Sequence, residues 1–361
     1  MSSPRRLDVI DIIKGIAIIM IVNVHLISGQ FFPIGRTYHV IAFFFTAGLL
    51  HGITEKWNRQ SLASFAKSRL KQLGHPYVLL SLCYILMHMV INIVRKDALV
   101  NIVVIGSFFK TITLRGIGTL WFLPVLFLGE IIFYGAKRRN IHSLLIVLLG
   151  VLAVFMSSYM NNKDILALLD SIKFTTLSLG DPIKVIISSL IASGFVAFGH
   201  LIYKPISQIF QESYFRSFKK LFILIAVCVA SFVVDFVLIG YYYGDLHKID
   251  IVNPIIYISC SLAGLTFVTS LALIIKRFSR IITNWMCYLG RNSLIIMTTH
   301  TEYYINSIAN VIIVSMISMM GLTMPSRVIS GFALLLIMLF EIGIIYIVNH
   351  SVLKRIFIAK K

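Results

Sequence analysis

Ten long apolar runs, separated by short polar segments, limit the fold of this chain more than any other feature. Each run is close to the length that an α-helix needs to cross a bilayer, about 20 residues. A soluble domain could not cover so much apolar side chain, because hydrophobic residues make up 58% of the 361 residues and charged residues only 13%. The runs occupy 9–29, 34–53, 74–94, 118–135, 141–160, 183–203, 221–243, 254–275, 288–316 and 327–349. The sequence therefore predicts an all-α fold, a polytopic transmembrane bundle of about ten helices.

A shorter apolar run over 98–114 contains Lys110, so we expect a re-entrant or interfacial segment there. The loops are too short to fold alone, and we expect one domain over 1–361 with no soluble domain attached. The four cysteines lie in or beside apolar runs without Cys-x-x-Cys spacing. We interpret them as small hydrophobic residues of helices, and we expect neither a disulfide frame nor a metal site.

The basic residues predict the orientation of the chain in the membrane. A net charge of +19 is compatible with nucleic-acid binding, but lysines and arginines occur in short clusters between the apolar runs, as in the loops of membrane proteins. If each run crosses once from a cytoplasmic N-terminus, most of the 33 basic residues fall on the cytoplasmic side. We therefore expect cytoplasmic N- and C-termini, a multi-pass place in the lipid bilayer of the cell (inner or cytoplasmic) membrane, and no nucleic-acid partner.

The first run carries Lys14 and His25, which are eleven residues apart. Three helical turns take about eleven residues, so both side chains should project from nearly one face, roughly 16 Å apart along the axis. Taken alone, Lys14 is best explained as an anchor that extends its ammonium group to the membrane boundary. An imidazole inside a spanning helix is costly without a partner, so His25 is a candidate functional residue.

A second histidine, His39, begins the second run. The connection between the first two runs is short, so we expect an antiparallel hairpin with His25 and His39 at similar depth near the outer face. Two histidines so placed could share proton-transfer work. Alternatively, His39 is an interfacial residue beside Arg36 and Tyr38, and the sequence does not decide between these interpretations.

Acidic residues inside the predicted helices should face the bundle interior, because each is costly in lipid. His300 and Glu302 are two positions apart, which predicts different sides of one helix, with Tyr304 on the His300 side. For Glu341 we favour a structural hydrogen-bond role. The four acidic residues inside predicted helices are Glu130, Asp235, Glu302 and Glu341.

The most basic cytoplasmic loop, 54–73, has Lys67, Arg69 and Lys71 close to the start of the third run. These charges could serve topology and meet anionic lipid headgroups. They could also bind the phosphates of a nucleotide-type cofactor. The sequence alone favours the first alternative.

Four blocks of the chain form a set of motifs: Lys14-Gly15-Ile16-Ala17 followed by His25, then 39–48, 118–124, and 289–294 with His300. Together they resemble the membrane-bound acyltransferase-3 family. The first block resembles the Arg/Lys-x10-His signature of its first helix, and the second resembles its FHMPLFFFLSG segment. The run 118–124 resembles its LWFLP motif, and 289–294 with His300 resembles its late LGRNSL…H motif. The blocks come in family order, and they look most like small stand-alone members of the fucose-O-acetylase type.

The resemblance implies a membrane O-acyltransferase, in most cases an O-acetyltransferase. Such an enzyme moves an acetyl group from cytoplasmic acetyl-CoA to a hydroxyl of a cell-envelope or exported polysaccharide or glycolipid. It implies no metal ion, a glycan or lipid-linked sugar as acceptor, and polysaccharide biosynthesis proteins as candidate partners. The implied general base is His25, helped by His39, and the implied donor-binding residues are Lys14, Arg69 and Lys71. For the substrate the residues are Trp121, Glu130, Arg291, Asn292, Ser293 and His300.

The chain also departs from the family pattern. Ala47 stands where the family usually has Ser, and Gln72 takes the second place of the usual Arg-x-x-Arg before the third helix. The chain ends after the tenth run, so we expect no attached esterase-like domain to receive the acyl group.

Two alternatives remain from the residues alone. A multipass transporter or flippase of a glycolipid or small anion could use the intramembrane His and acids as a proton relay. A non-catalytic membrane sensor or assembly partner is the other alternative. Consumption of acetyl-CoA in the presence of a sugar acceptor separates the enzyme from the transporter.

Overall fold

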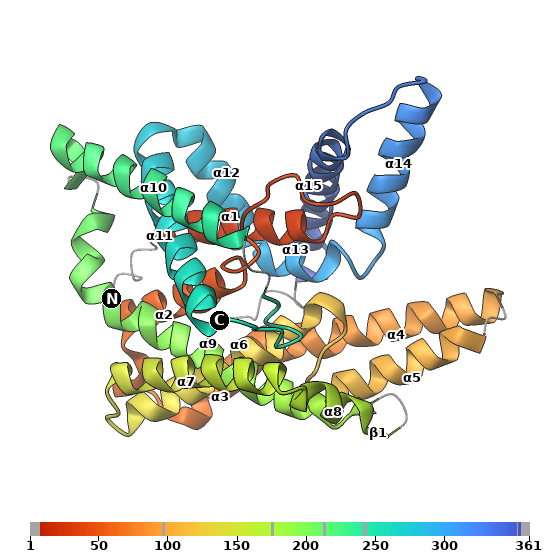
Figure 1. Cartoon of the computed structure of the whole chain (residues 1–361), viewed down its shortest axis with the longest axis horizontal. Coiled ribbons are helices and arrows are strands. Elements are labelled where there is room, and N and C mark those ends of the chain that lie inside the picture. Colours follow the sequence, from red (N-terminus) through yellow and green to blue (C-terminus); the bar gives the residue numbers. More distant parts are fainter. Residues whose placement is uncertain are drawn as a thin grey trace.

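The computed structural model describes residues 8–95, 98–174, 177–211, 214–240, 244–351 and 353–354, and these fold almost entirely into helices (Figure 1). The α-helices are α1 (Asp8–Val24), α2 (Ile41–Thr54), α3 (Leu62–Arg69), α4 (His75–Arg95), α5 (Ala98–Ile112), α6 (Phe122–Arg138), α7 (Ser143–Asn162), α8 (Ile165–Ser171), α9 (Gly180–Ile206), α10 (Phe218–Ile239), α11 (Pro254–Phe278), α12 (Arg280–Arg291), α13 (Ser293–Thr299), α14 (Ile305–Met319) and α15 (Ser326–His350). The short elements are the 3-10 turns η1 (Lys56–Asn58), η3 (Gly118–Trp121), η4 (Ser207–Phe210) and η5 (Tyr214–Arg216), the π-helical turn η2 (Leu70–Gly74), and the antiparallel strands β1 (Lys173–Phe174) and β2 (Leu177–Ser178).

Seven helical segments of the described residues are long and apolar enough to cross a membrane. Three shorter apolar helices, of 10–17 residues, accompany them at Ile41–Thr54, Ile102–Ile112 and Ile305–Met319. Many exposed side chains are apolar, for example Phe222, Val229 and Val233 on α10, as a helix facing lipid requires. The predicted all-helical membrane class is therefore confirmed, while the number of ten crossings and the cytoplasmic termini stay predictions.

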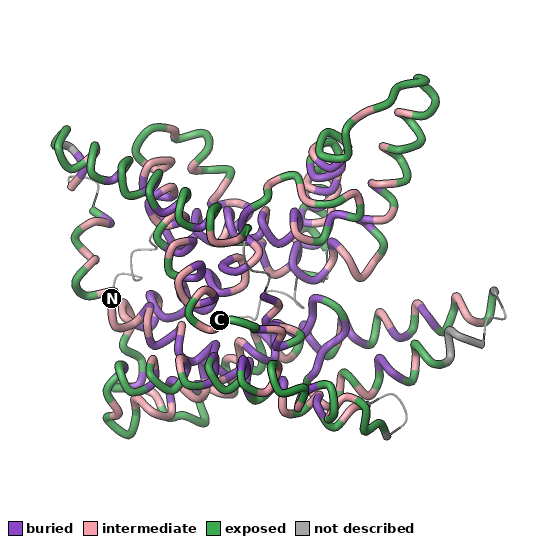
Figure 2. Tube along the Cα trace, viewed as in Figure 1, coloured by how far each residue is buried: buried purple, intermediate pink, exposed green. Residues whose placement is uncertain are grey.

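The core forms where α9 packs against α2, α6 and α7, and where α1 packs against α11 and α12. Figure 2 shows the buried residues gathered in the middle of the molecule, whereas the pair α4–α5 and the helix α14 extend away from it and are largely exposed. The close crossing of α1 and α12 depends on Gly290, because a Cβ atom there would collide with the backbone of Asp11 and Gly15. This crossing holds α1 in the middle of the bundle.

The second predicted helix begins later than its apolar run. We expected it from residue 34, but α2 begins at Ile41, and residues 25–40 form turns and loops. Asn23, which is fully buried, holds this segment against α1: its Oδ1 accepts the N–H groups of Phe31 and Phe32, both at 2.9 Å. Its Nδ2 also donates to the Phe32 carbonyl at 2.9 Å. A buried amide thus replaces the helical hydrogen bonds that the apolar run had suggested.

The prediction of one helix over 288–316 is wrong. The run divides into α12, α13 and α14, and residues 300–304 form turns, with Tyr304 in the left-handed region at φ 62°. Tertiary hydrogen bonds hold this break open: Tyr303 donates to the Leu80 carbonyl at 3.0 Å, and Glu302 accepts the Thr119 N–H at 2.8 Å. The predicted helical faces of His300, Glu302 and Tyr304 are therefore also wrong.

The run 98–114 forms α5, which packs along α4. Tyr77, near the start of α4, donates to the carbonyl of Thr111, near the end of α5, at 2.8 Å, which joins the two helices there. Its re-entrant or interfacial position stays a prediction.

Three of the four acids that we expected inside the bundle lie there. Glu130 and Asp235 are each 1% exposed, and Glu341 is fully buried. Glu341 accepts a hydrogen bond from Thr299 at 2.7 Å, as the favoured structural role predicts. Glu302 differs, because it lies at a cavity.

Candidate active site

A cavity of ≈ 380 Å³ lies where the ends of several helices meet. The end of α1, the turn before α2, η3 with the start of α6, and the loop before α11 form most of its wall. Its polar side is rich in histidines and in both signs of charge. The lining residues are Ile21, Val24, His25, Arg36, Thr37, His39, Val40, Gly118, Thr119, Trp121, Phe122, Gly244, Asp245, Leu246, His247, Lys248, Tyr257, Met297, Thr301 and Glu302.

His25 follows the last residue of α1, so Lys14 and His25 do not share one continuous helix as predicted. Its Nδ1 lies 2.8 Å from the carbonyl oxygen of Ile21. Because a carbonyl only accepts hydrogen bonds, Nδ1 carries the hydrogen and Nε2 of the neutral ring keeps its lone pair. The side chain is exposed at the cavity, where that lone pair is available as a base.

His39 repeats this arrangement in the turn that precedes α2. Its Nδ1 lies 2.5 Å from the carbonyl oxygen of Gly35, so its Nε2 is again the unprotonated nitrogen. Burial, and next the neighbouring His25, lower the pKa of His39 to about 4. His39 is therefore neutral near pH 7. The structure brings His25 and His39 to one cavity, and their catalytic roles stay predictions.

His300 lies behind His25 and is fully buried. Its Nδ1 donates to the Ile296 carbonyl at 2.7 Å, so its Nε2 is an acceptor. This Nε2 lies 3.5 Å from Nδ1 of His25, and the two rings meet edge to face with centroids 5.2 Å apart. A protonated His25 would thus direct its Nδ1–H toward two acceptors, which stabilises the imidazolium.

Glu302 supports the opposite wall. Its Oε1 accepts the N–H of Thr119 at 2.8 Å, at the start of η3, and the hydroxyl of Thr301, also at 2.8 Å. Gly118 is required beside it, because its φ is 44° and a Cβ atom there would overlap the Glu302 carboxylate. The carboxylate thus positions the turn that carries Trp121 into the cavity wall.

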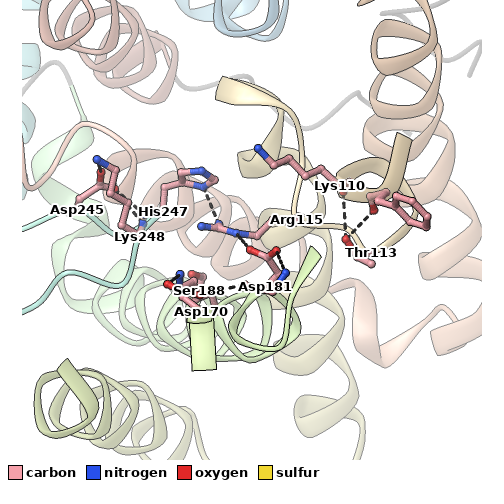
Figure 3. A network of polar contacts seen from close by, with 12 residues as sticks. Lys110, Thr113, Arg115, Asp170, Asp181, Ser188, Asp245, His247 and Lys248 are labelled. Carbon is pink, nitrogen blue, oxygen red and sulfur yellow. Dashed lines mark hydrogen bonds and ion pairs between the residues drawn. The ribbon is translucent and has the colours of Figure 1, made fainter. Parts of the chain in front are cut away.

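The remaining wall is the loop 244–248 before α11, whose His247 accepts a hydrogen bond from Arg115 (Figure 3). Arg115 lies between His247 and Asp181: its Nη1 donates to His247 Nδ1 at 2.8 Å and its Nε to Asp181 Oδ1 at 3.0 Å. Trp121 also packs against His247, with their ring centroids 5.0 Å apart. The sequence did not predict a role for Arg115, Asp181 or His247, since none of them lies in the four family-like blocks.

A second polar cluster lies toward the far end of α2, away from the cavity. Glu130 of α6 is paired with Arg69 and lies 3.3 Å from Nε2 of His51. Arg69 also donates to Gln72 at 2.7 Å across the π-helical turn η2. The structure thus brings two predicted site residues, Arg69 and Glu130, together with each other rather than with the cavity.

The predicted residues of the late block lie between helices. Arg291 donates to Asp11 of α1 at 2.9 Å. Asn292 donates to the Tyr288 carbonyl at 2.9 Å and accepts from Asn349 of α15 at 3.1 Å. Ser293 is buried at the start of α13. These contacts hold α12 and α13 in place, and the proposed substrate contacts of these residues stay predictions.

The two predicted donor-binding lysines are outside the cavity lining. Lys14 is half-buried within α1, and Lys71 is exposed on η2. Their roles stay predictions.

Three of the four family-like blocks line this cavity. The first contributes His25, the second His39 and the third Trp121, and His300 of the fourth lies behind His25. A family model described as an acyltransferase domain matches residues 7–348, nearly the whole chain. The chain belongs to the acyltransferase-3 family. No curated protein and no solved structure matches it.

Membership of the acyltransferase-3 family and the seven apolar helices make this a multipass membrane acyltransferase.

One signal in the sequence could have pointed to the cavity wall at His247: Asp245-Leu246-His247-Lys248 is a polar run between two apolar ones. Its partners Arg115 and Asp181 could not have been found in this way, because they lie 132 and 66 positions away from His247.

Proposed function

We propose that this acyltransferase-3 protein is an O-acetyltransferase of the cell membrane. In this proposal an acetyl group passes from cytoplasmic acetyl-CoA to a hydroxyl of a cell-envelope or exported polysaccharide or glycolipid. The observation that carries the proposal is the pair His25 and His39 at one cavity, each with Nδ1 bound to a backbone carbonyl and Nε2 left as a base.

The chemistry follows from that tautomer. Nε2 of His25 takes the proton of the acceptor hydroxyl as its oxygen attacks the carbonyl carbon of the thioester. The carbonyl π electrons move to oxygen, the tetrahedral intermediate then re-forms the C=O bond, and the C–S bond breaks to release the thiolate of CoA. The proton on His25 neutralises that thiolate. His300 supports the imidazolium through its Nε2, 3.5 Å from Nδ1 of His25.

His39 is the second base in this proposal, and Trp121 offers an apolar ring against which a sugar can pack. On the donor side, Arg69 is paired with Glu130, and Lys71, which is exposed beside it, binds the phosphates of acetyl-CoA in this proposal. In this proposal the ammonium group of Lys14 extends toward the same cytoplasmic side and also binds the donor.

The test uses inverted membrane vesicles from cells that produce the full chain, supplied with acetyl-CoA labelled in the acetyl group. We expect label in the glycan or glycolipid fraction, and we expect mass spectrometry to find an added acetyl group on an envelope glycan of the producing cells. His25→Ala should reduce the labelling rate by about 10²-fold or more. His350→Ala, at an exposed histidine outside the cavity, is the matched control.

A vesicle that moves a glycolipid or anion without transferring label would support the transporter instead. Unchanged labelling by His25→Ala, at equal amounts of inserted protein, would remove His25 from the role of base.

A further inference from the structure

The loop that carries His247 is built as a rigid support. Asp245 and Asp250 exchange backbone hydrogen bonds at 3.1 and 2.9 Å, and Asp245 Oδ1 accepts the N–H of His247 at 2.8 Å. Ser188 of α9 donates to the Leu246 carbonyl at 3.2 Å. Ile249 and Ile251 are fully buried. A loop held at this many points gives His247 a fixed position in the cavity wall.

The partner of His247 determines where its hydrogen lies. A guanidinium group only donates, so Nδ1 of His247 must accept the hydrogen bond from Arg115. The hydrogen of the neutral ring is therefore on Nε2. This tautomer is opposite to that of His25 and His39, whose Nδ1 atoms donate to carbonyls. One cavity thus has bases on one wall and a histidine N–H on another.

Arg115 is itself fixed. It is 8% exposed, and Asp181 at the start of α9 holds its Nε at 3.0 Å. Asp181 in turn accepts the N–H of Ser178 at 3.1 Å. The ion pair balances the buried charge and orients the guanidinium toward His247, as a carboxylate orients a catalytic histidine from behind.

We propose that His247 donates its Nε2–H to the acyl carbonyl oxygen of the donor and stabilises the oxyanion that forms there. This inference rests on the proposed acetyl transfer. As the acceptor oxygen bonds to the carbonyl carbon, the π electron pair moves onto oxygen, and the hydrogen bond strengthens with that charge. No proton leaves His247. When the C=O bond re-forms and the C–S bond breaks, the oxygen loses its charge and the hydrogen bond weakens again.

The charges around His247 keep the ring in the neutral donor form. Burial, and then the positive charges of Arg115, Lys110, Lys184 and Lys248, hold the pKa of His247 far below its ordinary value. The acids Asp181 and Asp245 face the same loop but bind Arg115 and backbone N–H groups. A donor that does not titrate near neutral pH keeps one function over the whole working range.

The experiment compares three variants of the full chain in vesicles supplied with acetyl-CoA, by the rate of CoA release and its dependence on acetyl-CoA concentration. His247→Leu removes the donor and should lower kcat about 10²-fold with KM changed little, as for other single oxyanion donors. His247→Gln keeps an N–H at the end of the side chain and should retain kcat within about tenfold of wild type. His350→Leu is the matched control and should behave as wild type.

Arg115→Met supplies a readout that a structural role would not move. Without the guanidinium, His247 loses its fixed tautomer and one of the charges that lower its pKa, so the ring becomes protonated at a higher pH than in wild type. We expect the acidic limb of the pH profile of kcat to move to higher pH, and this shift should disappear in the double variant Arg115→Met/His247→Gln. Arg327→Met, at an exposed arginine, is the control.

Wild-type kcat in His247→Leu would overturn the inference and leave the proposed function intact. Equal losses in His247→Leu and His247→Gln, with melting temperatures like that of wild type, would also overturn it. If the wild-type chain releases no CoA and transfers no acetyl group, the proposed function fails, and this inference fails with it.

Discussion

The two ends of α2 both carry a histidine among charged groups, but they differ in what those groups face. His39 precedes the first residue of the helix and His51 lies near its last, about 18 Å apart along the axis. At the His51 end, Glu130 is 1% exposed, and it pairs with Arg69 and His51. At the His39 end, imidazole nitrogens face a cavity of ≈ 380 Å³.

The difference teaches which polar cluster can act on a substrate. At the His51 end, here called the closed end, Glu130 lies between Arg69 and His51, within a shell of aromatic rings that includes Phe65 and Phe133. Such a cluster positions α2, α3 and α6. At the His39 end, here called the open end, one ring nitrogen of each histidine is bound by the protein: Nδ1 of His25 and His39 by a backbone carbonyl, and Nδ1 of His247 by Arg115, which pairs with Asp181. The Nε2 atoms of these rings are left for a substrate.

The largest expected effect on stability is at the closed end. Glu130→Ala leaves Arg69 and His51 without their acid, and breaking such a buried pair costs about 3 kcal/mol. The melting temperature in detergent should fall by several degrees, while transfer activity per folded molecule changes much less. Glu55→Ala, at an exposed acid, should leave both unchanged. A stable but inactive Glu130→Ala protein would break the comparison, since the closed end would then take part in the chemistry.

Loss of the loop support should affect the open end next. Asn23→Ala removes three hydrogen bonds that hold residues 31–32, and a buried amide of this kind contributes about 1–3 kcal/mol. We expect a lower melting temperature together with at least a tenfold loss of transfer, because the segment that carries His39 is no longer fixed. Asn58→Ala, at an exposed asparagine, serves as control. Full activity in a destabilised Asn23→Ala protein would show that the loop need not be held.

The pH dependence of stability gives a smaller effect with a defined sign. Because the pKa of His39 is lowered to about 4, the unfolded chain binds its proton first as the pH falls below about 6.5. The contribution of neutral His39 is thus complete above that pH and is lost between pH 6.5 and 4. Between pH 7.5 and 5.0, His39→Gln should lose about 2–4 °C less in melting temperature than wild type. An identical loss in both would mean that His39 is not held neutral.

The smallest effect concerns Lys71, an exposed cation beside the closed end. Lys71→Gln should raise the KM for acetyl-CoA about three- to fivefold with little change in kcat or stability, since an exposed charge contributes at most about 1 kcal/mol. Lys163→Gln, an exposed lysine after α7, is the control. An unchanged KM would assign Lys71 to membrane topology alone.

The helical class and the meeting of His25 and His39 could be predicted, because hydropathy and a short connection are local properties of the sequence. The break at 300–304 could not, since its polar groups are satisfied by Thr119 and Leu80, far away in the chain. The pairing of Arg69 with Glu130 was missed for the same reason.

The role of loop 244–248 shows the same limit most clearly. Nothing near His247 in the sequence indicates that Arg115 and Asp181 will lie behind it. Long-range contacts of this kind depend on how the helices pack, which an apolar pattern does not specify.

The most direct test compares His25, at the cavity, with His51, in the closed cluster near the end of α2, in one assay. The initial rate of labelled acetyl transfer from acetyl-CoA to the vesicle glycan is measured for His25→Gln and His51→Gln, at equal amounts of folded protein. The account predicts a loss of about 10²-fold or more for His25→Gln and less than about tenfold for His51→Gln. Equal rates in the two variants, or a larger loss at His51, would contradict the claim that the chemistry takes place at the open cavity.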